Sequence, residues 1–248
     1  MHCGPVQVLQ AANRAMPPAA ARGRLVLAGA GGALGNEVVR RLVGLGRFGS
    51  TEVLAREPIK AGLPRVSVRL VEGDDPAAWP PTTAGTAIVM FDPPRLFYQR
   101  ERALWTPQPG QLPALARWLR RSGVGTLAVV MPHAQGRLPE ALKRGLANLD
   151  EQALAALGFE RLLIIRSAQA PAPARSGSRL EGVARWMLGI FRYMLPGSEQ
   201  PVRAVKVAHL VAAALELAPP GIHVAAPQTV WEAAQGDPRA VVRDWLQR

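Results

Sequence analysis

Residues 25–39, LVLAGAGGALGNEVV, limit the possible folds of this chain more than any other stretch does. The stretch opens as a short apolar run over 24–28 that ends in glycines, which is typical of a buried strand. From 33 to 45 the apolar residues recur every three or four positions, and this period predicts an amphipathic helix. Three glycines therefore lie between a predicted strand and a predicted helix.

These glycines have the spacing of a turn that holds the diphosphate of a dinucleotide. Gly29 lets the chain turn sharply, Gly32 leaves room for a pyrophosphate, and Gly35 lets the helix pack closely on the sheet. The first helical residues, including Ala33 and Leu34, offer unpaired N–H groups to the phosphates. Such spacing arises easily by chance among 24 glycines, so the flanking strand and helix carry the prediction of NAD(P)(H) binding.

The rest of the chain alternates strands with helices. Strand patterns cover 52–55, 65–71, 86–91, 126–131 and 159–165, and helical patterns cover 112–121 and 138–157. The alternation predicts an α/β fold, a doubly wound parallel sheet of the Rossmann type. Further helical patterns follow at 180–195, 205–217 and 230–245. We expect one domain over 23–248, with a core at 24–166 and a small C-terminal helical lobe at 167–248 for substrate or partner contacts.

Composition indicates a packed globular protein, because apolar residues make up 48% of the chain in short blocks. The net charge of +12 comes almost entirely from scattered arginines. Attraction to polyanions, including nucleotide phosphates, stays open, but no run of like charges marks a nucleic-acid-binding tail. The scatter of the arginines along the chain favours a general bias in amino-acid composition over a binding surface for polyanions.

Residues 1–22 lack the continuous apolar stretch of a signal peptide, so we expect a flexible tail and a cytoplasmic protein. No apolar stretch reaches the ~20 uncharged residues of a transmembrane segment. Cys3 is the single cysteine, which excludes a disulfide framework and a cysteine-based metal site. We expect no bound metal.

The residue after the second strand indicates which dinucleotide binds, since an acid there bonds the ribose 2′-hydroxyl and an arginine accommodates a 2′-phosphate. Arg56 comes first and Glu57 follows, so NADP(H) is favoured and NAD(H) stays possible. The alternative is a solvated arginine paired with its neighbour. Asp74 either faces the adenine amino group or caps the short helix that starts near Pro76.

Several segments together carry a family resemblance: GAGGALG at 29–35, Gly73-Asp74, SGVGTLAVV at 122–130, LAALGFERLLIIR at 154–166 and PVRAVKVAHLVAAAL at 201–215. Over most of residues 24–225 the chain resembles the atypical short-chain dehydrogenase/reductases, in particular the NAD(P)H-binding oxidoreductases of the Tat-interacting-protein-like type. The resemblance implies a Rossmann fold, a dinucleotide cofactor and an NAD(P)H-dependent oxidoreductase.

The catalytic residues that the resemblance implies are missing from this chain. The family's serine after the fifth strand falls on Met131 or Pro132, and its Tyr-x-x-x-Lys pair falls on Lys143 and Ala147. A positioned proton donor contributes about 10²–10⁴-fold to such a reaction. The active site is therefore degenerate, and we do not expect the ordinary reductase mechanism.

Candidate substitutes lie where the predicted strands end, because ligands of open α/β sheets bind beyond the carboxyl ends of the strands. Asp92, His133 and Arg166 follow the fourth, fifth and sixth strands. His133 could replace the missing acid, because histidine titrates near neutral pH, and Lys143 could donate to a substrate oxygen. The plainer alternatives are a loop histidine without chemistry and a solvated lysine.

Two functions stay open: an oxidoreductase with a non-standard donor such as His133, and a catalytically silent, nucleotide-responsive binding or regulatory protein. The missing serine, tyrosine and lysine favour the second. The partner is then an unidentified small-molecule substrate or protein. For the aromatic, arginine-containing segment 180–195 we favour burial in the core or a homodimer interface over an anionic membrane surface or nucleic acid.

Overall fold

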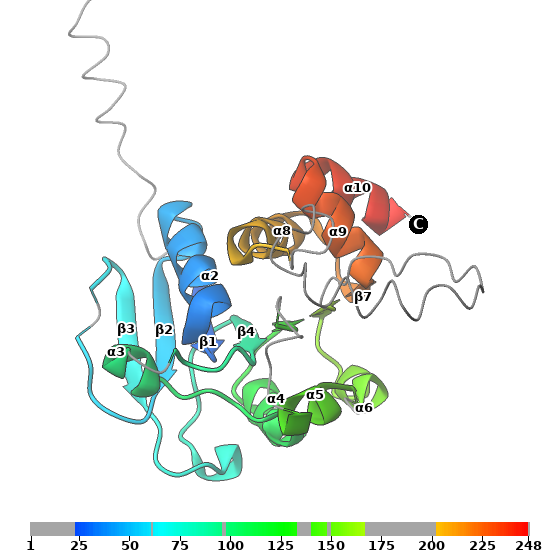
Figure 1. The fold of residues 1–248 in the computed structure, drawn as a ribbon. Helices are drawn as coiled ribbons and strands as arrows, with labels where there is room; N and C mark the ends of the chain where they lie inside the picture. The colour runs from blue at the N-terminus through cyan, green and yellow to red at the C-terminus, as the bar shows by residue number, and fades with distance from the viewer. Residues whose placement is uncertain are drawn as a thin grey trace, which may run out of the picture.

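The computed structural model describes residues 23–60, 62–95, 98–132, 140–147, 150–166 and 202–247. Within them, seven parallel strands form one sheet in the order β3-β2-β1-β4-β5-β6-β7 (Figure 1). Their bounds are β1 Arg24–Ala28, β2 Ser50–Ala55, β3 Val66–Leu70, β4 Thr86–Met90, β5 Thr126–Val130, β6 Arg161–Ile165 and β7 Gly221–Ala225. The strand order reverses between β1 and β4, which is the switch point of a doubly wound sheet. The α/β fold class predicted from the sequence is confirmed.

Helices cover both faces of the sheet (Figure 1). One face carries α2 (Gly32–Gly44), α8 (Ala204–Leu217), α9 (Pro227–Gln235) and α10 (Pro238–Gln247). The other carries α4 (Leu112–Arg121), α5 (Glu140–Ala147) and α6 (Glu151–Ala155). Three short helices lie in connections: η2 (Pro76–Ala78), α3 (Gln99–Arg102) and η3 (Pro109–Gln111).

Successive strand residues point to opposite faces, so the sheet divides the apolar core in two. In β1, Leu25 and Leu27 belong to the cluster beneath α2, while Val26 and Ala28 belong to the cluster beneath α4. All four are at most 3% exposed. Burial on both sides explains why the central strands read as continuous apolar runs.

The predicted single helix over 138–157 is wrong, because α5 and α6 are separate helices. Asp150 has a non-helical backbone (φ −82°, ψ 86°), and its carboxylate accepts a hydrogen bond from the N–H of Ala153 at 2.9 Å. It therefore caps the N-terminus of α6. The apolar period runs through both helices because both pack against the same face of the sheet.

The C-terminal region also differs from the predicted pattern. The predicted helix over 230–245 is two helices, α9 and α10, and α10 begins at Pro238, whose ring suits the first helical position. Strand β7 was missed because only Ala225 of its five residues is buried, so it lacks a strong apolar signal. Helix α8 packs along α2. The C-terminal region thus adds a strand to the sheet and helices to the layer that covers one of its faces.

Two of the predicted segments, the tail at 1–22 and the aromatic segment at 180–195, lie outside the described residues. Within the part of the chain that the structure describes, no helix combines the length and the apolar character needed to cross a membrane.

The connection from β2 to β3 has a consequence for the surface of the sheet. Parallel neighbours are usually joined by a helical crossover, but the described residues between Ala55 and Val66 contain no helix. The face of β2 and β3 beside α2 is therefore incompletely covered. Val66 and Val68 of β3 are only half-buried.

Candidate functional site

The glycine-rich turn between β1 and α2 has the tight geometry that the sequence indicates. Gly29 and Gly32 have positive φ angles of 75° and 74°, which glycine adopts without strain. A Cβ atom at Gly29 would lie 1.9 Å from the carbonyl oxygen of Met90, and one at Gly35 would lie 2.4 Å from the carbonyl carbon of Ala30. The turn and the close packing of α2 thus require these glycines.

The space beside Gly32 is taken up by the protein's own chain. A Cβ atom at Gly32 would lie 2.8 Å from the carbonyl oxygen of Pro93 and 3.0 Å from Cβ of Asp92. Both residues belong to the loop that follows β4. The sequence predicts that this space serves a pyrophosphate, and here the β4 loop lies against it.

Two carboxylates bind the N–H groups at the N-terminus of α2. Oε2 of Glu101 accepts a hydrogen bond from the N–H of Gly32 at 3.2 Å, and Oδ2 of Asp92 accepts one from the N–H of Leu34 at 3.1 Å. The N-cap residue, Gly31, has no side chain to cap the helix. The carboxylates therefore satisfy N–H groups that the sequence assigns to phosphate, at the positive end of the helix dipole.

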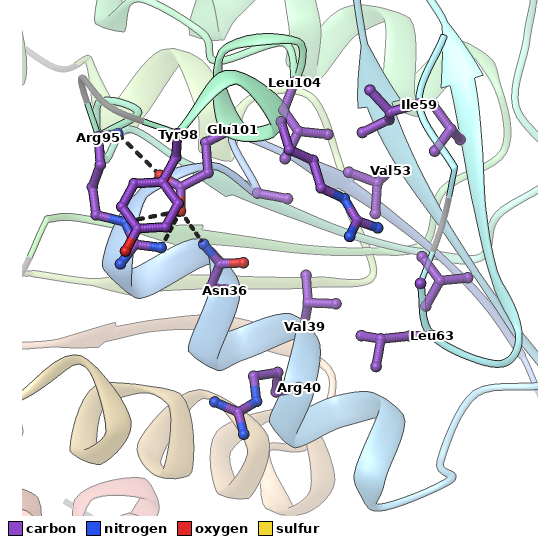
Figure 2. A pocket seen from close by; sticks show the side chains of 15 residues that line it. Asn36, Val39, Arg40, Val53, Ile59, Leu63, Arg95, Tyr98, Glu101 and Leu104 are labelled. Carbon is purple, nitrogen blue, oxygen red and sulfur yellow. Dashed lines mark hydrogen bonds and ion pairs between the residues drawn. The ribbon is translucent and has the colours of Figure 1, made fainter.

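Glu101, whose side chain is 6% exposed, is held in place by several hydrogen bonds to its carboxylate. Arg95 donates to Oε1 from Nε at 2.9 Å and also from Nη2, and its backbone N–H donates to Oε2 at 3.0 Å. Asn36 donates to Oε1 at 2.8 Å and to the carbonyl oxygen of Gly32 at 2.7 Å. The Arg95 guanidinium also lies over the ring of Tyr98, 3.9 Å from its centroid (Figure 2).

These donors decide the charge of Glu101. Burial by itself raises the pKa of the Glu101 carboxyl, but the hydrogen bonds and positive charge of Arg95, together with the N–H of Gly32, outweigh it and lower that pKa below its usual value. The Arg95 pKa is raised, chiefly by its hydrogen bond to Glu101. A full negative charge thus lies at the helix N-terminus at neutral pH.

The carboxyl ends of β1 and β2 are covered by residues 103–105, which cross them. Ala103 accepts a hydrogen bond from the N–H of Arg56 at 2.8 Å, and Trp105 donates to the carbonyl oxygen of Leu54 at 3.0 Å. The carbonyl oxygen of Trp105 accepts from the N–H of Gly29 at 3.0 Å. The backbone edge that would face the adenosine half of a dinucleotide is therefore hydrogen-bonded internally.

Arg56 and Asp74, predicted to meet the ribose phosphate and the adenine, pair with each other at 2.6 Å between Nη2 and Oδ1. The same Oδ1 atom accepts a hydrogen bond from Nε1 of Trp105 at 3.1 Å. Trp105 is fully buried and packs edge-on against Trp79, with ring centroids 4.9 Å apart. Asp75, rather than Asp74, caps the short helix at Pro76 by accepting from the N–H of Ala77. Roles for Arg56 and Asp74 in cofactor binding stay predictions.

The candidate catalytic residues are only partly described. His133 lies outside the described residues, and Lys143 lies in α5 without a described side chain. Met131 and Pro132, at the family's serine position, are buried directly after β5. At the end of β6, Arg166 forms an ion pair with Glu151 at 2.7 Å, a structural contact between β6 and α6. Catalytic roles for His133 and Lys143 also stay predictions.

Sequence reasoning missed Glu101 and Arg95 as residues of this site. They lie in a stretch between β4 and α4 that shows no helical or strand period, and Glu101 is 69 residues from Gly32 in the chain. The only available signal was Asp92-Pro93-Pro94-Arg95 after the fourth strand, where the family resemblance implies a glycine-containing turn. It marks a changed loop but does not reveal what the loop contacts.

No protein-family model and no curated protein sequence matches the chain. Among solved structures, it is distantly similar to MoeE5 in complex with UDP-glucuronic acid and NAD, with a TM-score of 0.49 and 15% identity over 82% of this chain and 75% of that chain. The enzyme WbmG of Bordetella bronchiseptica in complex with NAD gives 0.44 and 11%, over 90% and 82%. A short-chain dehydrogenase/reductase of Veillonella parvula in complex with NADP gives 0.40 and 12%, over 72% and 97%.

The fold is of the Rossmann type. The strand order establishes this, together with the crossing from β3 to β4 at the switch point. The similar structures hold NAD or NADP, as their names state. In this chain, Glu101 and Asp92 accept hydrogen bonds from the first turn of α2.

Proposed function

We propose that this chain is a catalytically silent Rossmann-type protein, a binding or regulatory protein that keeps its dinucleotide turn closed with its own carboxylates. The observation that carries the proposal is the buried Glu101 carboxylate. It accepts two hydrogen bonds at Oε2 and three at Oε1, and one of these five comes from the first residue of α2.

The argument is one of competition for the same donors. A pyrophosphate on this turn needs the N–H groups of Gly32 and its neighbours, which Glu101 and Asp92 engage in the structure. Two like charges about 4 Å apart repel by about 4 kcal/mol near a protein surface. A dinucleotide would therefore have to expel Glu101 from its network with Arg95 and Asn36.

The residues available for chemistry support the same proposal. Carbonyl reduction needs a proton donor near the developing alkoxide. Where the family resemblance implies a serine and a lysine, the chain has Met131, Pro132 and Ala147, whose side chains cannot donate a proton. The tyrosine position holds Lys143, which is the donor that the oxidoreductase alternative needs. Two independent observations therefore support the proposal: the carboxylates at the N-terminus of α2 and the residues at the implied catalytic positions.

The experiment is a titration of the full chain with NADPH and with NADH, followed by calorimetry and by the fluorescence of the reduced nicotinamide. We expect no saturable binding of either up to about 1 mM, and no oxidation of NADPH with aldehydes, ketones or quinones. A micromolar Kd for either dinucleotide would refute the closed turn. Turnover that is lost in His133→Ala or Lys143→Ala would establish the oxidoreductase alternative instead.

A matched pair of variants tests whether the carboxylate is the cause. Glu101→Ser removes the charge and most of the side chain and frees the N–H of Gly32, so the variant should bind NADPH more tightly than wild type does. Glu72→Ser, at an exposed position after β3, should behave as wild type. Melting curves of both variants show whether each one is folded.

A further inference from the structure

A cavity of about 360 Å³ lies beside α2 on the face of β2 and β3, where the described residues of the β2–β3 connection form no helix. This volume is in the range of small-molecule sites. Its wall includes Ala30 of the glycine-rich turn and also Asn36, Arg95 and Glu101.

The interior of the cavity is apolar (Figure 2). Its lining includes Val39, Val53, Ile59, Leu63, Val66 and Leu104. Val39 and Val53 are buried beneath it, whereas Leu63 is 38% exposed and Ile59 and Leu104 are half-buried. Apolar side chains that stay open to water in a concave site favour an apolar occupant, because binding would remove that surface from water.

A cationic side chain also lines this apolar space. Arg100, on α3, donates from Nη2 to the carbonyl oxygen of Lys60 at 2.5 Å, and its guanidinium lies beside Gly62. It thereby bridges α3 and the β2–β3 connection. Among the described residues, no carboxylate lies within ion-pair distance of Arg100, whereas Arg95 is paired with Glu101.

We propose that this cavity binds a small amphiphilic anion, a monocarboxylate with a short alkyl body. The body would lie against β2, β3 and α2, and the carboxylate would pair with the Arg100 guanidinium, whose planar fork suits a carboxylate. Charge complementarity selects this ligand class over a neutral or cationic one. The excess of basic over acidic residues in the whole chain, 30 against 18, gives a net charge of +12 and attracts the same sign of ligand.

The test is a calorimetric titration of the full chain with octanoate, compared with octanol and octylamine, which share its chain length. We expect saturable one-to-one binding of octanoate, with octanol about tenfold or more weaker, as the loss of one charge-assisted pair implies. Octylamine should not bind saturably. Methyl chemical shifts of Val39, Val53 and Leu104 should move with octanoate and thereby locate the site without any variant.

Three variants refine the test. Val68→Trp, from a half-buried position on β3 that lines the cavity, should fill it and abolish binding. Arg100→Gln should reduce octanoate affinity to that of octanol. Arg117→Gln, exposed on α4 across the sheet, should leave the affinity unchanged.

Three results would overturn the proposal. The first is the absence of saturable octanoate binding by the wild type, and the second is equal affinity for octanoate and octanol. The third is octanoate binding that leaves the methyl shifts around the cavity unmoved, which would place the ligand elsewhere. None of these results bears on dinucleotide binding, which the NADPH titration tests separately.

Discussion

The Oε2 atom of Glu101 lies 3.2 Å from the backbone nitrogen of Gly32 and accepts its N–H hydrogen bond. A buried carboxylate thus lies at the positive end of the α2 dipole. The same hydrogen bond links the β4–α4 connection to α2, so Glu101 also stabilises the fold. This dual role yields the first two predictions.

Replacing Glu101 by alanine should destabilise the protein by about 2–4 kcal/mol, because it leaves the N–H of Gly32 without its acceptor and Arg95 without its partner. The measurement is urea unfolding at neutral pH. Glu72→Ala, at an exposed acid, should change the free energy of unfolding by less than about 0.5 kcal/mol. Equal effects of the two substitutions would show that the network contributes little.

The lowered pKa of Glu101 makes stability depend on pH on the acid side. Its carboxyl binds protons more weakly in the folded state than in the unfolded chain, where the pKa is about 4.3. Its contribution is therefore complete above that value and is lost as the pH falls through the lower, folded pKa. The stability difference between wild type and Glu101→Gln should stay constant from pH 7 to about pH 5 and shrink below it. A difference that is unchanged down to about pH 3 would contradict the assignment.

The lowered pKa of His209, on α8, should make the stability of the protein depend on pH in a second, higher pH range. Burial lowers its pKa, and the positive charges of Arg41 on α2 and of Lys206 lower it further. The unfolded chain therefore takes up this proton first, so stability is complete above about pH 6.5 and falls as the pH drops through the folded pKa. His209→Gln should flatten the melting temperature between about pH 7 and pH 5 relative to wild type. An unchanged slope would show that His209 is not responsible.

Two glycines of α2 predict opposite effects of the same substitution. Gly35→Ala places a Cβ atom 2.4 Å from the carbonyl carbon of Ala30, so it should destabilise the protein by about 1–3 kcal/mol or prevent folding. Gly44→Ala, in the last turn, meets nothing within 4 Å and should stabilise it by up to about 1 kcal/mol. Thermal unfolding of both variants gives the comparison. A stable Gly35→Ala protein would mean that α2 does not pack closely at this point.

The elements with a strong local period could be predicted from the sequence. Helix α4 has the predicted bounds, and β1 follows from an apolar run that ends in glycines. Errors occurred where a new helix begins within a continuing apolar period, as α6 does after its N-cap Asp150. They also occurred where an edge strand buries little, as β7 does. The capping hydrogen bond of Asp150 and the edge position of β7 determined these two elements. Neither feature changes the apolar period from which the elements were predicted.

The sequence by itself determined that a strand, a tight glycine turn and a helix follow one another at residues 24–44, because these depend on neighbouring residues. The absence of a catalytic serine, tyrosine and lysine stays a prediction, because it depends on the family resemblance. Only the tertiary structure decided what faces the turn, since Glu101 and Asp92 reach α2 from segments 69 and 58 residues away in the chain. Which charges meet across such separations depends on how the loops pack, and no local pattern encodes it.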